Sequence, residues 1–379
     1  MKTTTTDNRI LALDIMRGIT IAGMILVNNA GSGTRYAPLA HAEWNGLTPT
    51  DLVFPFFMFI MGISTYISLR KFDFRPTAAT IWKIIRRTVV IFAIGLGLAW
   101  LGLFLHGILS EASLAEAVFC FDRIRILGVL PRLALCYGMA AIIAVTLPHR
   151  MLPALIAAML AAYAAILIVG NGYDCDAGNI LSRVDRALLG ENHMHRPEFD
   201  PEGILSTLPS VAHVLIGFWC GILMIQASDN NQRIRRLFII GTILTFAGFM
   251  LDYGLPVNKK VWSPSFVLVT CGMASSSLAL LIWIIDIKGR RRWCTFFRVF
   301  GMNPLFLYVL AAVMAMVAGA VKVMSAGEPV SVKRWFYDNV LLTSLHDPYV
   351  ASLAYSILFV LANWIIGYIL YKKKIYIKI

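Results

Sequence analysis

The stretch NNAGSGTRYAPLAHAEWNGLTPTD, residues 28–51, joins two long apolar runs and governs how the rest of the chain is interpreted. An apolar run of about 20 residues is long enough to cross a membrane as a helix. Two such helices need only a few residues between them, whereas this connector carries the imidazole of His41 and the side-chain amides of Asn28, Asn29 and Asn45. We therefore expect a pair of membrane helices here, with chemistry where their connector meets water.

The composition of the whole chain indicates a helical membrane protein. Of its 379 residues, 58% are hydrophobic and only 15% are charged, whereas soluble domains carry about 25% charged residues. The alternating segments of about 10 residues that mark a membrane β-barrel do not occur in this sequence. No internal repeat or low-complexity linker divides the chain. We expect an all-α polytopic membrane bundle that forms a single domain over residues 1–379.

The apolar runs predict about ten spans. Their approximate ranges are 10–29, 50–69, 84–106, 126–147, 151–169, 208–226, 237–251, 265–287, 296–321 and 349–370. The second span begins with a clear helix signal. Thr48 can cap the N-terminus of the helix, Pro49 suits the first helical position, and Asp51 lies at the positive end of the helix dipole. The longest polar connectors are residues 171–206 and 322–347.

The distribution of Lys and Arg predicts the orientation. Ten spans put both termini on one side, and that side carries 21 Lys and Arg residues against 11 on the other, with Arg17 and Arg132 inside spans completing the 34 of the chain. Cytoplasmic segments of membrane proteins are enriched in Lys and Arg, so both termini are expected in the cytoplasm. The same rule explains the net charge of +13, and we expect a lipid bilayer rather than a nucleic acid as partner.

The cysteines give no indication of a metal site or a disulfide framework. No CxxC pair and no Cys/His cluster has the spacing of metal ligands, so we expect no metal. The six cysteines are Cys120, Cys136, Cys175, Cys220, Cys271 and Cys294.

Several polar residues fall within the predicted spans, where charge is costly. Asp14 and Arg17, at spacing i,i+3, can form an ion pair; alternatively, Arg17 meets an anionic ligand that enters from the cytoplasm. Arg132 follows a proline in the fourth span and must face protein, water or a ligand, and pairing with Asp14 or another carboxylate would give the same pattern. Asn303 precedes a proline and marks a helix break or a helix start.

Six blocks of this chain resemble the heparan-alpha-glucosaminide N-acetyltransferase family in its compact bacterial form. The blocks are LDIMRGITIAGMILVNN, HAEWNGLTPTDLVFPFFMFIMGIS, GVLPRLALCY, EGILSTLPSVAHVLIGFWCG, NKKVWSPSFVLVTCGMA and FGMNPLFLY. The resemblance implies a transferase of the bacterial inner membrane that passes acetyl from cytosolic acetyl-CoA to a glucosamine-type amine on the far side. The family's active-site histidine precedes the WNG motif, which is His41 here. Its active-site asparagine follows MILV, which is Asn28.

The residue types suit this chemistry. An imidazole with a pKa of about 6.5 can deprotonate an amine at neutral pH or accept the acetyl group itself. The amide of Asn28 can donate to the thioester oxyanion, and Asp51, Asn29 or Asn45 could orient the ring or the sugar. Trp44, Lys259 and Lys260 are further candidates for contact with the acceptor. Trp44 and Asp51 also have structural explanations, in the aromatic belt and the helix start.

The charged donor must keep its nucleotide near the cytoplasmic face. We expect Arg17, Arg132 and Asn303 to contact the donor, while other basic residues at that face, such as Arg86 and Arg87, either bind its phosphates or only set the topology. The alternatives are an O-acyltransferase of a cell-envelope glycan and a transporter. A transporter would show inverted repeats, which this sequence lacks. A homodimer is possible because small residues in spans can pack subunits.

Overall fold

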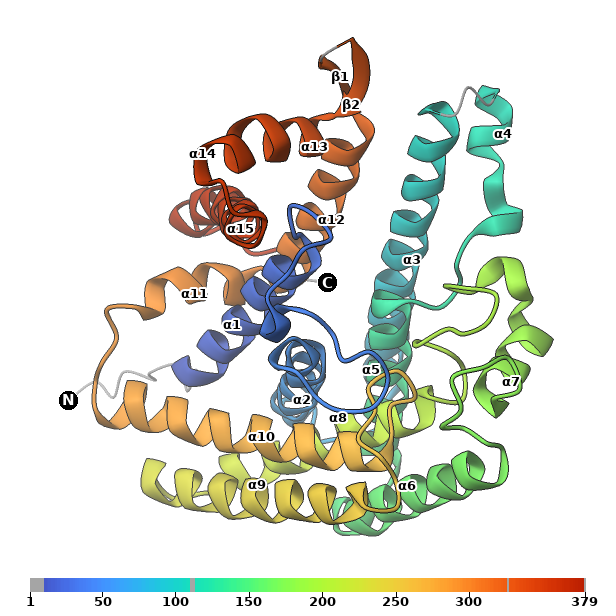
Figure 1. The fold of residues 1–379 in the computed structure, drawn as a ribbon. Coiled ribbons are helices and arrows are strands. Elements are labelled where there is room, and N and C mark those ends of the chain that lie inside the picture. Colours follow the sequence, from blue (N-terminus) through green and yellow to red (C-terminus); the bar gives the residue numbers. More distant parts are fainter. Residues whose placement is uncertain (1–9, 110–112, 326, 378–379) are drawn as a thin grey trace.

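The computed structural model describes residues 10–109, 113–325 and 327–377, and it is a bundle of helices (Figure 1). Within these residues, nine helices are long and apolar enough to cross a membrane. They are α1 (Leu11–Asn28), α2 (Pro49–Arg70), α3 (Ala78–Leu109), α5 (Val129–Thr146), α6 (Leu152–Val169), α8 (Thr207–Ile225), α9 (Asn230–Asp252), α10 (Pro264–Ile282) and α15 (Pro348–Lys372). The predicted all-α polytopic bundle is confirmed.

The predicted ninth span is broken, which corrects the expectation of one helix over residues 296–321. Helices α11 (Cys294–Met302) and α12 (Pro304–Ala320) meet at an angle of 86°. The break lies at Asn303, because the next residue is a proline, which has no N–H and suits the first position of a new helix. Counting this pair as one span gives ten.

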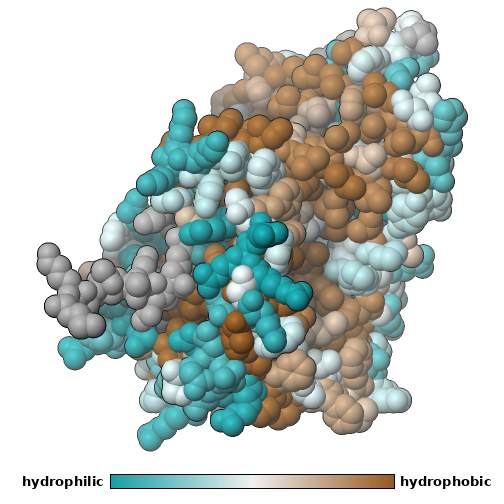
Figure 2. Space-filling model, turned by 90° about the vertical axis from the view of Figure 1, so that its left-hand side faces the viewer, coloured by the Kyte–Doolittle hydropathy of each residue, from teal (hydrophilic) through white to brown (hydrophobic). Residues whose placement is uncertain are grey.

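Helices differ in how deeply they lie in the bundle. Within the most apolar 18 residues of each helix, 72% are buried in α8, 6% in α3 and 17% in α9. Figure 2 shows a broad hydrophobic area on one face of the molecule, with hydrophilic residues gathered beside it. The inner helices pack closely: a Cβ on Gly62 of α2 would lie 2.1 Å from the carbonyl oxygen of Val214 in α8. Small residues allow such contacts between membrane helices.

The connectors contain short elements that the apolar pattern did not predict. The helical ones are η1 (Ala37–Leu39), α4 (Leu114–Val118), η2 (Cys120–Arg123), η3 (His149–Met151), α7 (Ile180–Leu189), η4 (Glu191–His193), α13 (Val332–Phe336), η6 (Tyr337–Leu342) and α14 (Thr343–Leu345). The segment η5 (Trp283–Ile287) instead continues α10 to the end of the predicted eighth span. Strands β1 (Lys322–Ser325) and β2 (Glu328–Ser331) form an antiparallel hairpin.

Three connectors that the charge count assigns to the outer face meet at one end of the bundle. The indole of Trp44 donates to the carbonyl of Tyr173 at 2.7 Å, which ties residues 29–48 to residues 170–179. Asn45 accepts from the side chain of Asn258 at 3.0 Å, which ties the first connector to the segment before α10. At this end of the bundle, the connectors therefore lie around and above the ends of the helices. Its assignment to the outside of the cell stays a prediction.

Candidate active site

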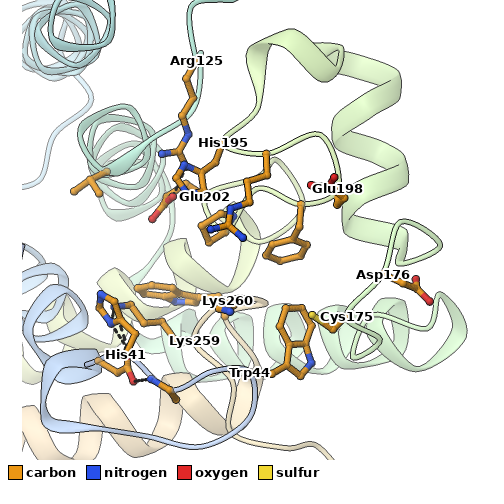
Figure 3. A pocket seen from close by; sticks show the side chains of 17 residues that line it. His41, Trp44, Arg125, Cys175, Asp176, His195, Glu198, Glu202, Lys259 and Lys260 are labelled. Atoms are coloured by element: carbon orange, nitrogen blue, oxygen red, sulfur yellow. Dashed lines mark hydrogen bonds and ion pairs between the residues drawn. The ribbon is translucent and has the colours of Figure 1, made fainter. Parts of the chain in front are cut away.

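The three connectors enclose a cavity of about 730 Å³, which we call the outer cavity (Figure 3). The end of the segment before α5 completes its wall. Its polar and aromatic lining residues are His41, Trp44, Asp51, Arg125, Asp176, His195, Arg196, Glu198, Phe199, Glu202, Lys259, Lys260 and Trp262. The cavity therefore brings together residues from four widely separated parts of the sequence.

His41, Asp51 and Lys259 form one charged cluster in this cavity. The Nδ1 atom of His41 lies 2.6 Å from Oδ1 of Asp51. The ammonium of Lys259 lies 3.1 Å from the same ring nitrogen and 3.2 Å from the same carboxylate oxygen. A carboxylate beside Nδ1 favours the tautomer with the proton on that atom. The lone pair of Nε2 is then free, and the half-exposed His41 ring can present it to a substrate.

The two oxygens of Asp51 have separate contacts. Oδ1 contacts His41 and Lys259, whereas Oδ2 accepts from the backbone N–H of Ala42 at 3.0 Å and of Thr48 at 3.2 Å. Thr48 and Asp51 form a capping box at the start of α2, which confirms the predicted helix signal. Because Asp51 is 1% exposed and held by backbone donors, it fixes the position of the imidazole.

Lys259 lies in the segment before α10 and is largely removed from water. Burial lowers the pKa of Lys259, and the neighbouring Asp51 carboxylate opposes that change. The Asp51 carboxylate thus has two side-chain partners at Oδ1, the imidazole of His41 and the ammonium of Lys259.

A second, smaller cavity of about 110 Å³ adjoins the first; we call it the inner cavity. It is lined by residues of α1, α2, α5 and α12, including Asn28, Phe54 and Tyr308. Four residues line both cavities: His41, Val129, Glu202 and Lys259. The predicted catalytic pair Asn28 and His41 therefore lines one cavity, at the point where it meets the other.

An aromatic wall closes another part of the outer cavity. The Trp44 and Phe199 rings are 5.4 Å apart and meet edge to face. The ammonium of Lys260 lies 5.4 Å from the centre of the Trp44 ring and donates to the carbonyl of Glu43. Trp44 and Lys260 thus line the cavity, and their contact with the acceptor stays a prediction.

Other predicted substrate-binding residues lie outside both cavities. The Asn29 side chain donates to the carbonyl of Ile25 at 2.8 Å, and thus satisfies a carbonyl of its own helix. Asn45 is bonded to Asn258, as described above, and joins two connectors. Both amides have a structural role here, and a role in binding stays a prediction.

The three residues expected to contact the donor are also bonded within the protein. Arg17 lies 3.4 Å from Asp14, which confirms their pairing, and 2.6 Å from the hydroxyl of Ser64. Asn303 is bonded through its amide to the C-terminal segment, at the carbonyl of Ile375 (2.9 Å) and the N–H of Ile377 (2.8 Å).

Arg132 is fully buried and lies near the end of α5 that faces the outer cavity. It donates to the carbonyl of Gly203 at 3.1 Å and to the hydroxyl of Ser206. Its guanidinium lies 5.4 Å from the centre of the Trp262 ring. The side chain therefore supports the connector before α8, and donor binding by Arg17, Arg132 and Asn303 stays a prediction.

Sequence reasoning missed a network on the opposite wall of the outer cavity. Arg125 forms two bonds with Asp200, at 3.0 and 2.6 Å, and a third with Glu202. Burial alone would lower the pKa of Arg125, but its bonds with the two carboxylates raise it above its ordinary value. The available signal was the concentration of Asp, Glu and His in residues 171–206, immediately before a span.

Comparisons with known proteins agree with the resemblance seen in the sequence. Residues 9–251 match the family model described as heparan-alpha-glucosaminide N-acetyltransferase, catalytic. Proteins of that name from Mus musculus and Homo sapiens are each 26% identical to this chain over 98% of its length. The chain spans 61% and 60% of the length of these two relatives. The matched residues include His41, Asp51, Arg125 and Glu202.

Proposed function

The chain belongs to the heparan-alpha-glucosaminide N-acetyltransferase catalytic family, and on this premise we propose that it transfers acetyl from acetyl-CoA to the amine of a glucosamine-type sugar or glycan. One observation carries the proposal: the His41 imidazole is held by Asp51 at the junction of two cavities. The outer cavity is large enough for a sugar, and the inner cavity is narrow and mostly apolar, which suits the acetyl end of a thioester.

Each side chain at the junction has a proposed part in the reaction. The acceptor nitrogen bonds to the acetyl carbon, the bond from carbon to sulfur breaks, and the electron pair leaves with the CoA thiolate. Nε2 of His41 takes the proton that the amine loses. Asn28 donates to the developing oxyanion, and such a donor contributes about 2.7–4 kcal/mol in known cases. Asp51 positions the imidazole and stabilises its protonated form.

Direct transfer agrees best with two cavities that share His41. Both substrates can then be bound at once, so the acetyl group need not be stored on the enzyme. The alternative, an acetylated imidazole, would use the same Nε2 atom as the nucleophile.

The proposal extends to the membrane. The donor's nucleotide stays at the cytoplasmic face, its pantetheine arm enters the bundle, and the acceptor arrives from outside. Both termini are then cytoplasmic, the membrane is the inner membrane of a bacterium, and residues 1–379 form a single domain. Homodimer formation stays a prediction.

Labelled acetyl-CoA tests the proposal. Purified protein in lipid nanodiscs should transfer label to glucosamine, and His41→Ala should reduce transfer at least 100-fold. His346→Asn is the matched control, because His346 is exposed and lines neither cavity. Equal activity of His41→Ala and wild type would refute the site. Movement of glucosamine across a vesicle membrane without acetylation would instead support a transporter.

A further inference from the structure

Glu202 lies where the two cavities meet. It lines both of them, together with His41 and Lys259, and its side chain is 15% exposed. Figure 3 shows Glu202 with Arg125 and His195 on one side of the outer cavity, and His41 with Lys259 on the other. Glu198 and Asp176 also line the outer cavity but not the inner one. Glu202 is therefore the carboxylate that faces the imidazole across the junction.

The turn that carries Glu202 is held from three sides. Asp200 accepts from the N–H of Glu202 itself at 2.9 Å. Asp185 of α7 accepts from the N–H of Ile204 at 2.8 Å, two residues further on. Arg132 of α5 donates to the intervening Gly203 carbonyl, so each backbone unit of the turn meets a charged side chain.

The absence of a side chain at Gly203 leaves room for the Asp185 carboxylate. A Cβ there would lie 1.9 Å from the Asp185 carboxylate. That carboxylate is buried, and burial raises the pKa of Asp185 to about 6. Oδ2 of Asp185, and Nε and Nη1 of Arg132, have no hydrogen-bond partner in the part of the chain that the structure describes. Burying ionisable groups that are only partly paired lowers the stability of the fold. Asp185 and Arg132 together hold the turn in place and thereby fix the position of Glu202.

Two carboxylates share one guanidinium beside Glu202. Arg125 binds Asp200 through two bonds and reaches only Oε2 of Glu202. Among the described residues, no hydrogen bond or ion pair reaches Oε1. On the opposite wall, Lys259 forms its ion pair with Asp51 and also interacts with the charge of Glu202, so it offsets that charge in part and leaves Oε1 open to a further cation.

We infer that Glu202 is the binding site for the ammonium group of the acceptor, and that it selects a cationic primary amine over a hydroxyl in the same position. This inference rests on the proposed function and specifies its acceptor. The ammonium donates to Oε1 of Glu202 while another of its protons points to Nε2 of His41. Transfer of that proton to the imidazole leaves a neutral amine, still oriented by Glu202, whose lone pair attacks the acetyl carbon. Protonated His41 then gives its proton to the departing CoA thiolate, and the neutral imidazole accepts the second proton that the new amide nitrogen loses. A hydroxyl brings no charge to offset the carboxylate.

The test compares Glu202→Gln with Glu191→Gln, an exposed carboxylate of the same connector that lines neither cavity. With acetyl-CoA saturating, Glu202→Gln should raise the KM for glucosamine at least 10-fold and leave the KM for acetyl-CoA within twofold. Glu191→Gln should leave both within twofold. Glu202→Asp, which keeps the charge on a shorter side chain, should recover part of the affinity. An unchanged KM for glucosamine, or a fall in kcat alone, would overturn the assignment.

Calorimetry separates this inference from the proposed activity. Wild type should bind glucosamine at least 10-fold more tightly than glucose, and Glu202→Gln should abolish that preference. If Glu202→Gln does not fold, Glu202→Ala serves in its place, and binding identical to wild type counts against the inference. Label transfer without a preference that depends on Glu202 overturns the ammonium site only. A preference that depends on Glu202, without transfer, supports the ammonium site and overturns the acetyltransferase.

Discussion

Replacing Asp51 by Asn tests how the imidazole is prepared for proton transfer. The two oxygens of Asp51 have separate partners, with backbone donors at Oδ2 and His41 and Lys259 at Oδ1. An asparagine keeps the backbone bonds if its oxygen occupies the Oδ2 position. Its amide NH₂ group then faces Nδ1 of His41. Nδ1 must become an acceptor, so the proton moves to Nε2, where the reaction needs a lone pair.

The size of the effect follows from the bond that is lost. A hydrogen bond to a charged group contributes about 1.5–3 kcal/mol, and about 1.4 kcal/mol corresponds to a factor of 10. Loss of the bond between Asp51 and protonated His41 alone lowers kcat about 10- to 100-fold, and the wrong tautomer adds to this. Folding stability should fall by about 1.5–3 kcal/mol, because the cap is kept but the largely buried Lys259 loses its carboxylate partner. Asp51→Ala, in contrast, leaves the buried N–H groups of Ala42 and Thr48 unpaired, at about 1–3 kcal/mol each.

The assay is acetylation of glucosamine at saturating concentrations of both substrates, with thermal unfolding followed by intrinsic fluorescence. Asp176→Asn is the control, since Asp176 lines the same cavity and accepts from the backbone of Gly178. Asp51→Asn should lose at least 100-fold in kcat while it remains folded at the assay temperature. Retention of kcat within twofold would refute the proposed role of the carboxylate. A variant that is unfolded at the assay temperature would show that loss of structure explains the effect.

Three further outcomes are expected. Burial raises the pKa of Asp185 from 3.8 to about 6, so this carboxyl binds its proton more tightly in the folded state than in the unfolded state. The free energy of unfolding of the wild type should therefore fall by about 3 kcal/mol as pH rises through this interval. Asp185→Asn should lack this fall, and thermal unfolding at pH 4 and pH 7 checks it. Gly62→Ala should lower the unfolding temperature because the added Cβ meets the Val214 carbonyl at 2.1 Å, whereas Gly97→Ala, with no atom within 4 Å, should not. Initial velocities with both substrates varied should give intersecting lines, as direct transfer requires, and parallel lines with a trapped acetyl-enzyme would contradict it.

The local features of this fold could be predicted from the sequence. Helix α2 begins where Thr48, Pro49 and Asp51 indicate, because capping depends on residues three apart. The apolar runs locate the spans because insertion into a membrane depends on the length and composition of each segment. The 86° angle at Asn303 could not be read in the same way, since a proline after an asparagine is equally consistent with a break in a helix or the start of one.

The site was only partly predictable, because its contacts join distant residues. His41 and Trp44 could be proposed from one connector and a resemblance. Lys259 lies 218 residues from His41 in the sequence, and Arg125 lies 77 residues before Glu202. Nothing in local composition fixes which of many surface charges will meet across a cavity. That pairing depends on how the helices pack.

The arrangement explains why the proposed reactive groups lie on connectors and at helix ends rather than in the middle of helices. A charged acceptor cannot enter hydrocarbon without a large desolvation cost, so its binding carboxylate must lie at an aqueous end of the bundle. An acetyl thioester carries no charge at its reacting end and can lie among apolar residues such as Phe54. A site that gives water access to the acceptor and apolar surroundings to the thioester is found where connectors cover the ends of helices. His41 and Glu202 occupy that boundary, and the buried side chains of Asp51, Asp200 and Arg132 keep them there.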